Sequence, residues 1–302
     1  MPRVSVIVPC YNHLKYLPER LGSIFGQTFD DFEVILVDDG STDGSREYLE
    51  ALSGKDKVSA VITGDANSGS AFRQWKKGFG AASGELVWIA ESDDACFPGM
   101  LETLVAEFDR DPACVLAFCA SMLTAEDGSP MGIHPYQQQI GKDLRMDGKA
   151  FVRRWQMRNN CIVNASGALF KKSTLDAVDD AFLGYSGAGD WLFWAEVAVQ
   201  GNVAFVWQPL NRFRRGEGNT TAAMKRSGRA LAELCGIRGD FERIGFRSPI
   251  LRLSNRVYAV SMAKYGPPLP DGIKAEVLEQ WKDNAFISLL ARLKAKVRTS
   301  YS

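Results

Sequence analysis

The sequence predicts an α/β protein with a mostly parallel sheet, extended at its C-terminus by a helical region. Short apolar, β-branched segments alternate with helical patterns in the first third of the chain. This alternation is typical of parallel strands joined by helices. The last third carries helical patterns only, so it is predicted to form a separate part.

Four segments have the composition of strands and are followed by turn-forming residues: 3–9, 32–38, 57–63 and 85–90. Helical patterns fill residues 15–27, 43–53, 70–82 and 98–110, the last of which opens with a proline. Because parallel strands end at one edge of the sheet, the polar residues that follow them should gather on one rim, where ligands bind.

Beyond these elements the pattern is less regular. A turn is predicted at 124–132, a helix near 148–158 and a second α/β stretch at 166–207. We therefore expect one α/β domain at residues 1–215 and a helical region at 216–302, with a proline-rich loop at 265–272.

Composition limits the classes of function. The 36 basic residues balance the 36 acidic ones, and no basic run interleaved with aromatic residues occurs in the first two thirds, which disfavours a nucleic-acid partner. The six cysteines include no CxxC pair, which is typical of a reducing cytosol. No apolar stretch approaches the ~18 residues that span a bilayer. We expect a cytoplasmic protein, with peripheral attachment to the inner face of the membrane as the alternative.

A glycine-rich segment, "GFGAASG" from Gly78 to Gly84, looks like a dinucleotide-binding fingerprint. However, it ends a predicted helix and precedes a strand, whereas the fingerprint needs the opposite order. A dinucleotide cofactor is therefore disfavoured, and we interpret the glycines as the end of the helix.

The sharpest signal is "ESDD", Glu91 to Asp94, directly after a predicted strand. Carboxylates on such a turn can hold Mg²⁺ or Mn²⁺ by one or two oxygens while substrate phosphates complete the shell. The alternative is an acidic loop that caps the next helix. A second acidic pair, Asp38 and Asp39, ends another strand of the same rim and favours a site.

Two further acidic positions have two interpretations each. In "VDDGSTDGS" one aspartate could accept a hydrogen bond from a nucleobase N–H, while a simple Asx turn accounts for Asp43. In "GDWLFW", Asp190 is either a general base or a helix cap. His13 follows the first strand and is expected near the rim, and His134 is expected at the surface. No Ser-His-Asp order and no zinc-type spacing occurs.

Taken in order, these residues resemble the family 2 glycosyltransferases, an inverting group with the GT-A fold, which is a Rossmann-like nucleotide-binding sandwich. The resemblance covers about residues 3–215. It rests on "VSVIVPCYNHLKYLPERLGSIFGQTFDDFEVILVDDGSTDGS" and on "NSGSAFRQWKKGFGAASGELVWIAESDD", in which glutamate opens the usual aspartate-x-aspartate motif.

The resemblance implies roles for individual residues. The nucleotide site would comprise Pro9, Tyr11, Asn12, Asp39, Arg73, Glu91 and Asp93. Asp39 would accept the base N–H, Asp93 and Asp94 would hold Mn²⁺ or Mg²⁺, and Asp190 would be the catalytic base. One departure is a missing histidine: the aligned place reads Gly216-Glu217, so Arg214, Arg215 or the tail would have to supply its charge, or activity is weakened.

The implied activity is that of an inverting hexosyltransferase. It would move a sugar from a nucleotide-sugar donor, UDP- or dTDP-linked, to a hydroxyl of a glycan or lipid-linked acceptor during polysaccharide biosynthesis. A non-catalytic nucleotide- or glycan-binding relative is the alternative. A sugar nucleotidyltransferase is disfavoured, because "VPCYNHLKYL" lacks the glycines of a phosphate loop.

The C-terminal segment "FISLLARLKAKVRTSYS", Phe286 to Ser302, places apolar residues near one helical face together with basic residues and no acidic one. This pattern suits a helix that lies on an anionic membrane, where a lipid-linked acceptor would be met. It equally suits a helix that packs on protein with its charges in solvent.

Overall fold

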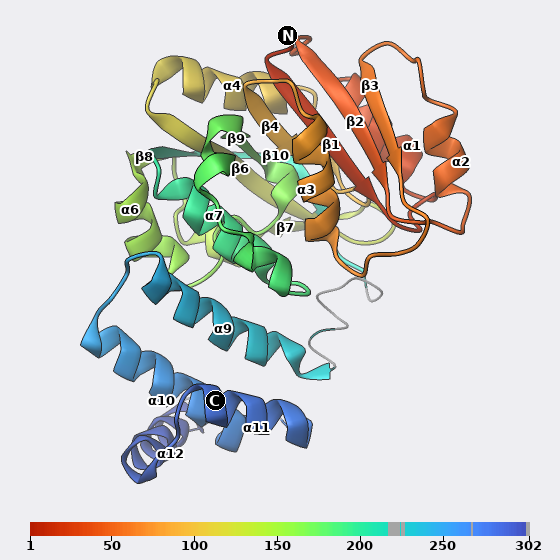
Figure 1. The fold of residues 1–302 in the computed structure, drawn as a ribbon. Coiled ribbons are helices and arrows are strands. Elements are labelled where there is room, and N and C mark those ends of the chain that lie inside the picture. Colours follow the sequence, from red (N-terminus) through yellow and green to blue (C-terminus); the bar gives the residue numbers. More distant parts are fainter. Residues whose placement is uncertain (217–223, 225–226, 267, 300–302) are drawn as a thin grey trace. The chain divides into compact units, whose positions relative to one another are not determined.

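The computed structural model describes residues 1–216, 224, 227–266 and 268–299. The chain forms two compact units: residues 1–184 with 193–216, and residues 185–192 with 217–302. The first unit is the α/β part (Figure 1). The second consists of helices and of the short segment that begins helix α7 (Gly189–Ala198), so this helix starts in one unit and ends in the other.

The centre of the first unit is a single ten-stranded sheet. Its strands lie in the order β3-β2-β1-β4-β9-β6-β10-β5, and in addition β7 pairs with β6 and β8 pairs with β10. The strands are β1 (Val4–Cys10), β2 (Phe32–Asp38), β3 (Val58–Thr63), β4 (Leu86–Ile89), β5 (Ala95–Cys96), β6 (Cys114–Thr124), β7 (Pro130–Ile133), β8 (Leu144–Asp147), β9 (Ala168–Lys171) and β10 (Asn202–Arg214).

The sheet is mostly parallel, as predicted. Strands β3, β2, β1 and β4 pair in parallel. Strand β9 is antiparallel to both of its neighbours, β4 and β6, so β6 and its parallel partner β10 run in the direction of β1. The carboxyl ends of β1, β2, β4, β6 and β10 therefore lie at the same edge of the sheet.

The helices of the first unit are α1 (Leu17–Phe25), α2 (Ser45–Glu50), α3 (Ala71–Ala81), α4 (Met100–Arg110), α5 (Pro135–Gln138) and α6 (Gly148–Phe151). A π-helical turn, Val152–Gln156, continues α6, and 3₁₀ turns occur at Ala165–Gly167, Lys172–Ala177 and Asp180–Gly184. The second unit contains α9 (Arg229–Arg243), α10 (Pro249–Tyr265), α11 (Asp271–Gln280) and α12 (Ala285–Thr299).

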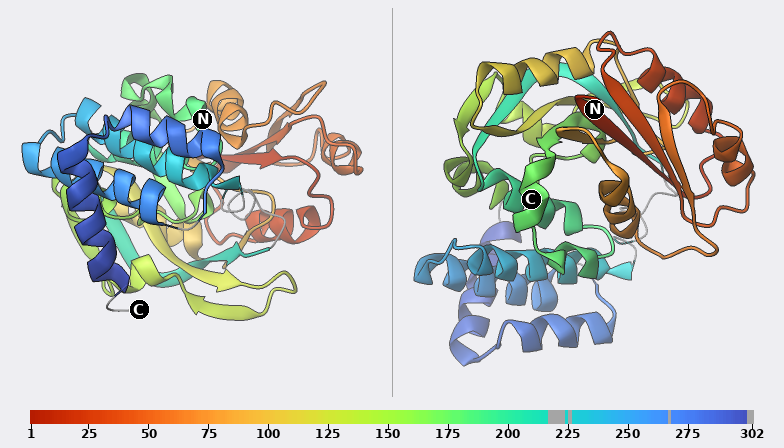
Figure 2. Two further views of the ribbon diagram at one scale, coloured as in Figure 1. Left: turned by 90° about the horizontal axis from the view of Figure 1, so that it is seen from below. Right: turned by 45° about the horizontal axis from the view of Figure 1, so that its top comes forward.

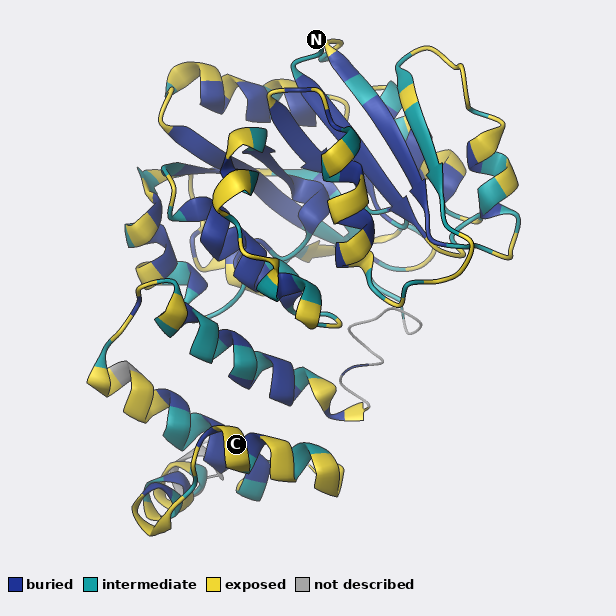
Figure 3. Cartoon of the chain, in the orientation of Figure 1, coloured by how far each residue is buried: buried dark blue, intermediate teal, exposed yellow. Residues whose placement is uncertain are grey.

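Helices cover both faces of the sheet (Figures 1 and 2). The alternation of β1 explains the two layers, because Val4, Val6 and Val8 join the cluster that contains the apolar faces of α1 and α4. Ile7 points to the opposite face, where α3 packs. The residues of the central strands are therefore mostly buried and form the core of the unit (Figure 3).

The glycine-rich segment Gly78 to Gly84 ends a helix and precedes a strand, as predicted: α3 ends at Ala81, β4 begins at Leu86, and Gly78 lies near the C-terminal end of α3. A Cβ atom at Gly78 would lie 2.3 Å from Cγ2 of Ile7. The glycine therefore allows α3 to pack closely on β1. Gly78 thus faces a strand and is not part of a phosphate-binding loop.

In the second unit, the described residues from 227 onward contain helices and no strand, as predicted. Its core comprises Leu231, Cys235, Ala259, Val277 and Trp281. All six cysteines of the chain are buried and unpaired. No helix in the described part of the chain combines the length and the apolar character required to cross a bilayer.

Candidate donor site and acidic loop

The loops that follow β1 and β2 are held together at the rim. Asn12 has a positive φ of 53°. Its backbone N–H donates to Oγ of Ser41 at 2.9 Å, and its Oδ1 accepts from the N–H of Thr42 at 2.8 Å. Pro9 is buried in β1, whereas Tyr11 is 39% exposed. Of the three predicted residues, Asn12 therefore ties the loop after β1 to the loop after β2.

Asp38 and Asp39 have different partners. Asp38 Oδ2 accepts from the backbone N–H groups of Gly40 and Ser41, both at 3.0 Å, which closes the turn. Position 40 requires glycine, because its φ is +74° and because an added Cβ atom would lie 2.7 Å from the backbone of Ala66. Asp38 is therefore mainly a turn-forming residue.

Asp39 is 3% exposed and belongs to a polar cluster. It accepts hydrogen bonds from the N–H of Ser68 at 3.0 Å, from Oγ of Ser68 at 2.8 Å and from Nε2 of Gln74 at 2.5 Å. Sequence reasoning missed Ser68 and Gln74. The sequence signal that could have identified Gln74 was its place between Phe72 and Trp75 on the predicted helix 70–82, because a polar side chain among buried apolar ones needs a hydrogen-bond partner.

The acidic loop after β4 begins with Glu91, whose Oε1 accepts from the indole N–H of Trp75 at 2.8 Å. Burial, and then the charge of Asp93, raise the pKa of Glu91 to about 8. The pKa values of Asp93 and Asp94 are also raised by burial. Three neighbouring acids with raised pKa values are costly to ionise together. A positive charge beside them would lower this cost.

Asp94 anchors this loop. It is 1% exposed. Its Oδ2 accepts from Nδ2 of Asn164 at 2.8 Å and from Oγ of Ser166 at 2.7 Å, and its Oδ1 accepts from the backbone N–H of Arg214 at 3.0 Å. Both carboxylate oxygens are thus engaged by protein donors, and the loop is tied to β10.

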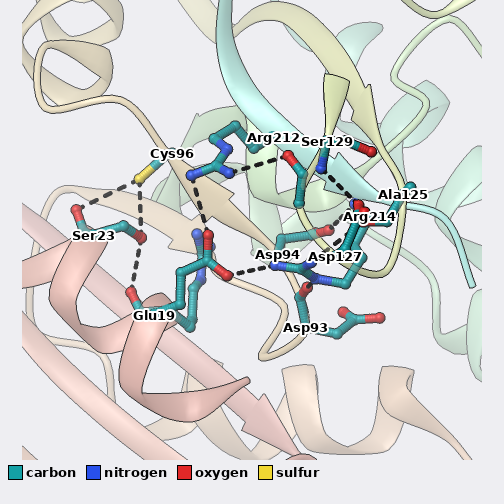
Figure 4. Close-up of polar contacts among 12 residues, drawn as sticks. Glu19, Ser23, Asp93, Asp94, Cys96, Ala125, Asp127, Ser129, Arg212 and Arg214 are labelled. Atoms are coloured by element: carbon teal, nitrogen blue, oxygen red, sulfur yellow. Dashed lines mark hydrogen bonds and ion pairs between the residues drawn. The ribbon is translucent and has the colours of Figure 1, made fainter. Parts of the chain in front are cut away.

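Arg214 holds the loop from the other side (Figure 4). Its Nε donates to the backbone oxygen of Asp93 at 2.9 Å, Nη1 donates to the backbone oxygen of Glu126 at 2.8 Å, and Nη2 pairs with Glu19. The side chain of Asp93 lies beside these contacts but takes part in none of the dashed interactions. Glu91 and Asp93 are both partly exposed, whereas Asp94 is buried; Glu91 accepts from Trp75, which leaves Asp93 as the partly exposed carboxylate of the loop without a side-chain contact in Figure 4.

The sequence from Ser5 to Val178 matches the family described as "Glycosyl transferase family 2", and this stretch is more than half of the chain. The chain belongs to glycosyl transferase family 2. The structural resemblance agrees in fold: the S. aureus TarS fragment 1–349, crystallised with UDP-GlcNAc, has a TM-score of 0.62 at 19% identity, covering 92% of this chain and 71% of that one. At that identity the similarity shows the GT-A fold alone.

Two further proteins are similar to this family 2 chain. A GalNAc(5)-diNAcBac-PP-undecaprenol β-1,3-glucosyltransferase of Campylobacter jejuni is 32% identical over 180 residues, which are 58% of this chain and 54% of that protein. The mannosyltransferase PcManGT of Pyrobaculum calidifontis, solved with GDP-Man and Mn²⁺, has a TM-score of 0.55 at 19% identity, covering 98% and 86%. The chain spans 37% to 68% of the lengths of four curated relatives.

The other expected residues of this family 2 chain have varied surroundings. Arg73 is exposed on α3. His13 lies at the rim, where its Nδ1 is 2.7 Å from Oγ of Ser92, and burial lowers its pKa against the opposing charges of Asp43 and Asp94. His134 is half-buried and caps α5.

The position of the missing histidine is only partly described. Gly216 lies next to Glu126, whose Oε1 would be 3.0 Å from an added Cβ atom, and Glu217 lies outside the described residues. Of the two arginines considered as replacements, Arg214 is occupied in holding the acidic loop. Arg215 is half-exposed, with its guanidinium carbon 5.3 Å from the ring centre of Phe213.

Asp190 lies in the first turn of α7, in the second unit. Its Oδ1 accepts from the backbone N–H of Trp191 at 2.8 Å. The positive end of the helix dipole stabilises a carboxylate at this position. The geometry is compatible with the cap and with the base, because a base at a helix start is held by the same contacts.

Proposed function

We propose that this protein is a metal-dependent inverting glycosyltransferase. It moves a hexose-type sugar from a UDP- or dTDP-linked donor to a hydroxyl of a glycan or lipid-linked acceptor. The observation that carries this proposal is that the acidic residues of the loop after β4 have different contacts. Asp94 and Arg214 fix the shape of the loop, and the carboxylate of Asp93 is left to meet a ligand at the rim.

The donor nucleotide is assigned to the loops after β1, β2 and β4. Uracil and thymine carry an N–H group that can donate a hydrogen bond to a carboxylate. Hydrogen bonds from Ser68 and Gln74 hold the carboxylate of Asp39 in one orientation. Tyr11 offers a partly exposed ring beside Asn12. The UDP-GlcNAc of the TarS crystal supports a uridine-linked donor, whereas the GDP-Man of the PcManGT crystal supports only a nucleotide-sugar donor in general.

The residues present fit a divalent ion of the Mn²⁺ or Mg²⁺ type. Among the described residues no group of three or more His, Cys, Asp or Glu side chains forms a protein cage for a metal. This suits ions that take one or two carboxylates and complete their shell with substrate phosphates. We assign the ion to Asp93, with Asp94 shaping the loop. Such an ion stabilises the negative charge of a leaving nucleoside diphosphate.

Asp190 is assigned as the general base. It would accept the proton of the acceptor hydroxyl while that oxygen attacks the anomeric carbon from the face opposite to the nucleotide. One displacement inverts the anomeric centre, so an α-linked donor gives a β-linked product. The nucleoside diphosphate leaves with the electron pair of the broken bond.

The first test is a thermal-shift screen of the full chain with UDP, dTDP, GDP and CMP, with and without Mn²⁺. We expect a selective, Mn²⁺-dependent rise in Tm that is lost in Asp39→Asn and Asp93→Asn. Asp56→Asn is the matched control, because Asp56 is an exposed acid away from the rim. If no nucleotide shifts the Tm, the chain is a degenerate relative and the proposal is wrong.

We further propose that the acceptor is met at an anionic membrane. Helix α12 has two apolar faces: Ile287 and Ala291 are buried against Val260 of α10, whereas Phe286, Leu289 and Leu293 are 60%, 56% and 52% exposed. The exposed residues follow the spacing i, i+3 and i+7, which places them on one face. The undecaprenol-linked substrate in the name of the Campylobacter jejuni relative supports a lipid-linked acceptor.

A basic groove in the same unit adds to the membrane proposal. It has a volume of about 680 Å³ and is lined by Glu242, Arg243, Arg247, Ser248, Pro249, Arg252, Leu253 and Arg256. Four arginines face a single acid there. Ile250, next to the groove, is 82% exposed. Basic side chains beside exposed apolar ones are the combination by which surface helices bind anionic lipids.

A further inference from the structure

One carboxylate of α9, that of Glu233, accepts from three successive backbone N–H groups of the segment that leads to Asp190. Oε1 of Glu233 accepts from the backbone N–H of Ser186 at 2.7 Å, and Oε2 accepts from the N–H groups of Gly187 at 3.0 Å and Ala188 at 2.9 Å. Glu233 is 5% exposed. Three successive N–H groups that converge on one buried carboxylate form a strong, charge-assisted cluster.

This cluster lies directly before the first residue of α7, and Asp190 is the second residue of that helix. The first N–H groups of a helix and those preceding it lack partners within the helix, so an acceptor must come from elsewhere. Glu233 is that acceptor, and its negative charge lies at the favourable end of the helix dipole. The start of α7 is thereby fixed by a side chain from α9.

Other contacts between the same two segments agree. The hydroxyl of Tyr185 donates to Oδ2 of Asp240 at 2.6 Å. Gly236 leaves room for that tyrosine, because an added Cβ atom would lie 2.7 Å from its hydroxyl oxygen. Positions 233, 236 and 240 lie on one face of α9. On the other side of Asp190, the ring of Trp191 meets that of Phe241 at 5.9 Å.

We infer that Glu233 is a positioning residue for the general base: it fixes the backbone before α7 so that Asp190 is presented in one geometry. This inference rests on the proposed role of Asp190. It makes α9, which lies beyond residues 5–178 matched by the family, a part of the catalytic machinery. A displacement of about 1 Å at a catalytic group can cost about a hundredfold in rate.

The test compares Glu233→Gln with Glu279→Gln in the full chain. Glutamine keeps the size of the side chain but replaces one acceptor oxygen by a donor, which cannot serve the N–H groups. Glu279→Gln makes the same chemical change at an exposed acid of α11 in the same unit and leaves the three N–H groups paired, so it is the matched control. The activity readout is UDP release from UDP-glucose and UDP-GlcNAc with Mn²⁺, and Kd for UDP is measured in parallel.

We expect Glu233→Gln to lower kcat about 10- to 100-fold, with KM and the Kd for UDP within twofold of wild type. Glu279→Gln should change kcat less than threefold. Unchanged kcat in Glu233→Gln, or a fall in UDP affinity that matches the fall in rate, would overturn the inference.

Two measurements separate this inference from the proposed function. If Asp190→Asn keeps the wild-type kcat, the assignment of the base is wrong. If Asp190→Asn is inactive while Glu233→Gln is as fast as wild type, only the role of Glu233 is wrong. Independently of turnover, hydrogen exchange of the amides of residues 186–188 should speed up at least tenfold in Glu233→Gln, while strands β1 and β2 exchange as before; unaltered exchange would contradict the clamp.

Discussion

The guanidinium carbon of Arg20 lies 4.8 Å from the ring centre of Trp88, and the arginine is fully buried. None of its three nitrogen atoms donates to an acceptor among the described residues. Its charge instead acts on the acidic loop, where it opposes the rise in the pKa of Glu91, Asp93 and Asp94 that burial causes. Arg20 is thus the internal counter-charge of the loop that we assign to the metal.

Replacing Arg20 by Met should destabilise the metal-free protein by about 3 kcal/mol, because the buried acids lose their compensating charge. Mn²⁺ supplies a positive charge of its own, so it should raise the Tm of Arg20→Met more than that of wild type. Arg158→Met, at an exposed position, is the control. Calorimetry with and without Mn²⁺ measures both effects, and an equal Mn²⁺ shift in the two proteins would contradict the assignment.

The two aspartates of the loop should respond differently to the same change. Asp94→Asn places an amide donor against the donors of Asn164, Ser166 or Arg214, which should cost about 1–3 kcal/mol of unfolding free energy. Asp93→Asn should leave the metal-free stability unchanged or higher and abolish the Mn²⁺-dependent response to nucleotide. Urea unfolding checks the first effect and Mn²⁺ titration the second. The reverse pattern would exchange the two roles.

Glu107 predicts a pH dependence of stability. This residue of α4 is 4% exposed and accepts from Nε of Arg145 at 2.6 Å and from Nη2 at 2.7 Å. Burial alone would raise its pKa, but the hydrogen bonds from Arg145 and Arg110 outweigh burial and lower it below the ordinary value of 4.5. A lowered folded pKa gives stability that is present above about pH 4.5 and is lost as the pH falls through the folded pKa.

Glu107→Gln should therefore reduce the unfolding free energy at pH 7 by about 2 kcal/mol and flatten its decline between about pH 5 and pH 3. Urea unfolding across this range provides the measurement. Glu102→Gln on the same helix is a control, since Glu102 is exposed. Parallel pH curves for Glu107→Gln and wild type would show that the ion pair contributes nothing.

Gly78 should not accept a side chain. Gly78→Ala would place its Cβ atom 2.3 Å from Cγ2 of Ile7, which should cost about 1–3 kcal/mol as strain between α3 and β1. Ile7→Ala in the same chain should recover part of that loss. A double-mutant cycle measures the coupling, and strictly additive effects would exclude this contact as the cause.

The membrane proposal predicts that the full chain cosediments with vesicles containing anionic lipid and much less with neutral vesicles. Deleting residues 286–302, or replacing Phe286 and Leu289 by Ser, should lower the bound fraction several-fold. Lys55→Ser in the first unit is a control for a general loss of charge. Unchanged pelleting of both variants would remove the helix from the proposal.

Much of the nucleotide-binding half could be predicted from sequence, because its signals are local. The four β-branched segments became β1 to β4 within one or two residues at each end. Strand β6, "CVLAFCASMLT", was missed, since a continuous apolar run does not distinguish a buried strand from a helix. The short strands β5, β7 and β8 gave no periodicity long enough to recognise, because only pairing with β6 and β10 defines them.

The sequence by itself determined the order of the strands' polar ends, and thus that Asn12, Asp39 and Asp93 would lie on one rim, because chain direction and strand ends are properties of local pattern. It also left α12 with two interpretations. Only the tertiary structure decided which oxygen meets which donor: Asp94 is engaged by residues about 70 and 120 positions away, and Glu233 by residues about 45 positions away. Such partners are brought together by packing of distant elements, and no local pattern records them.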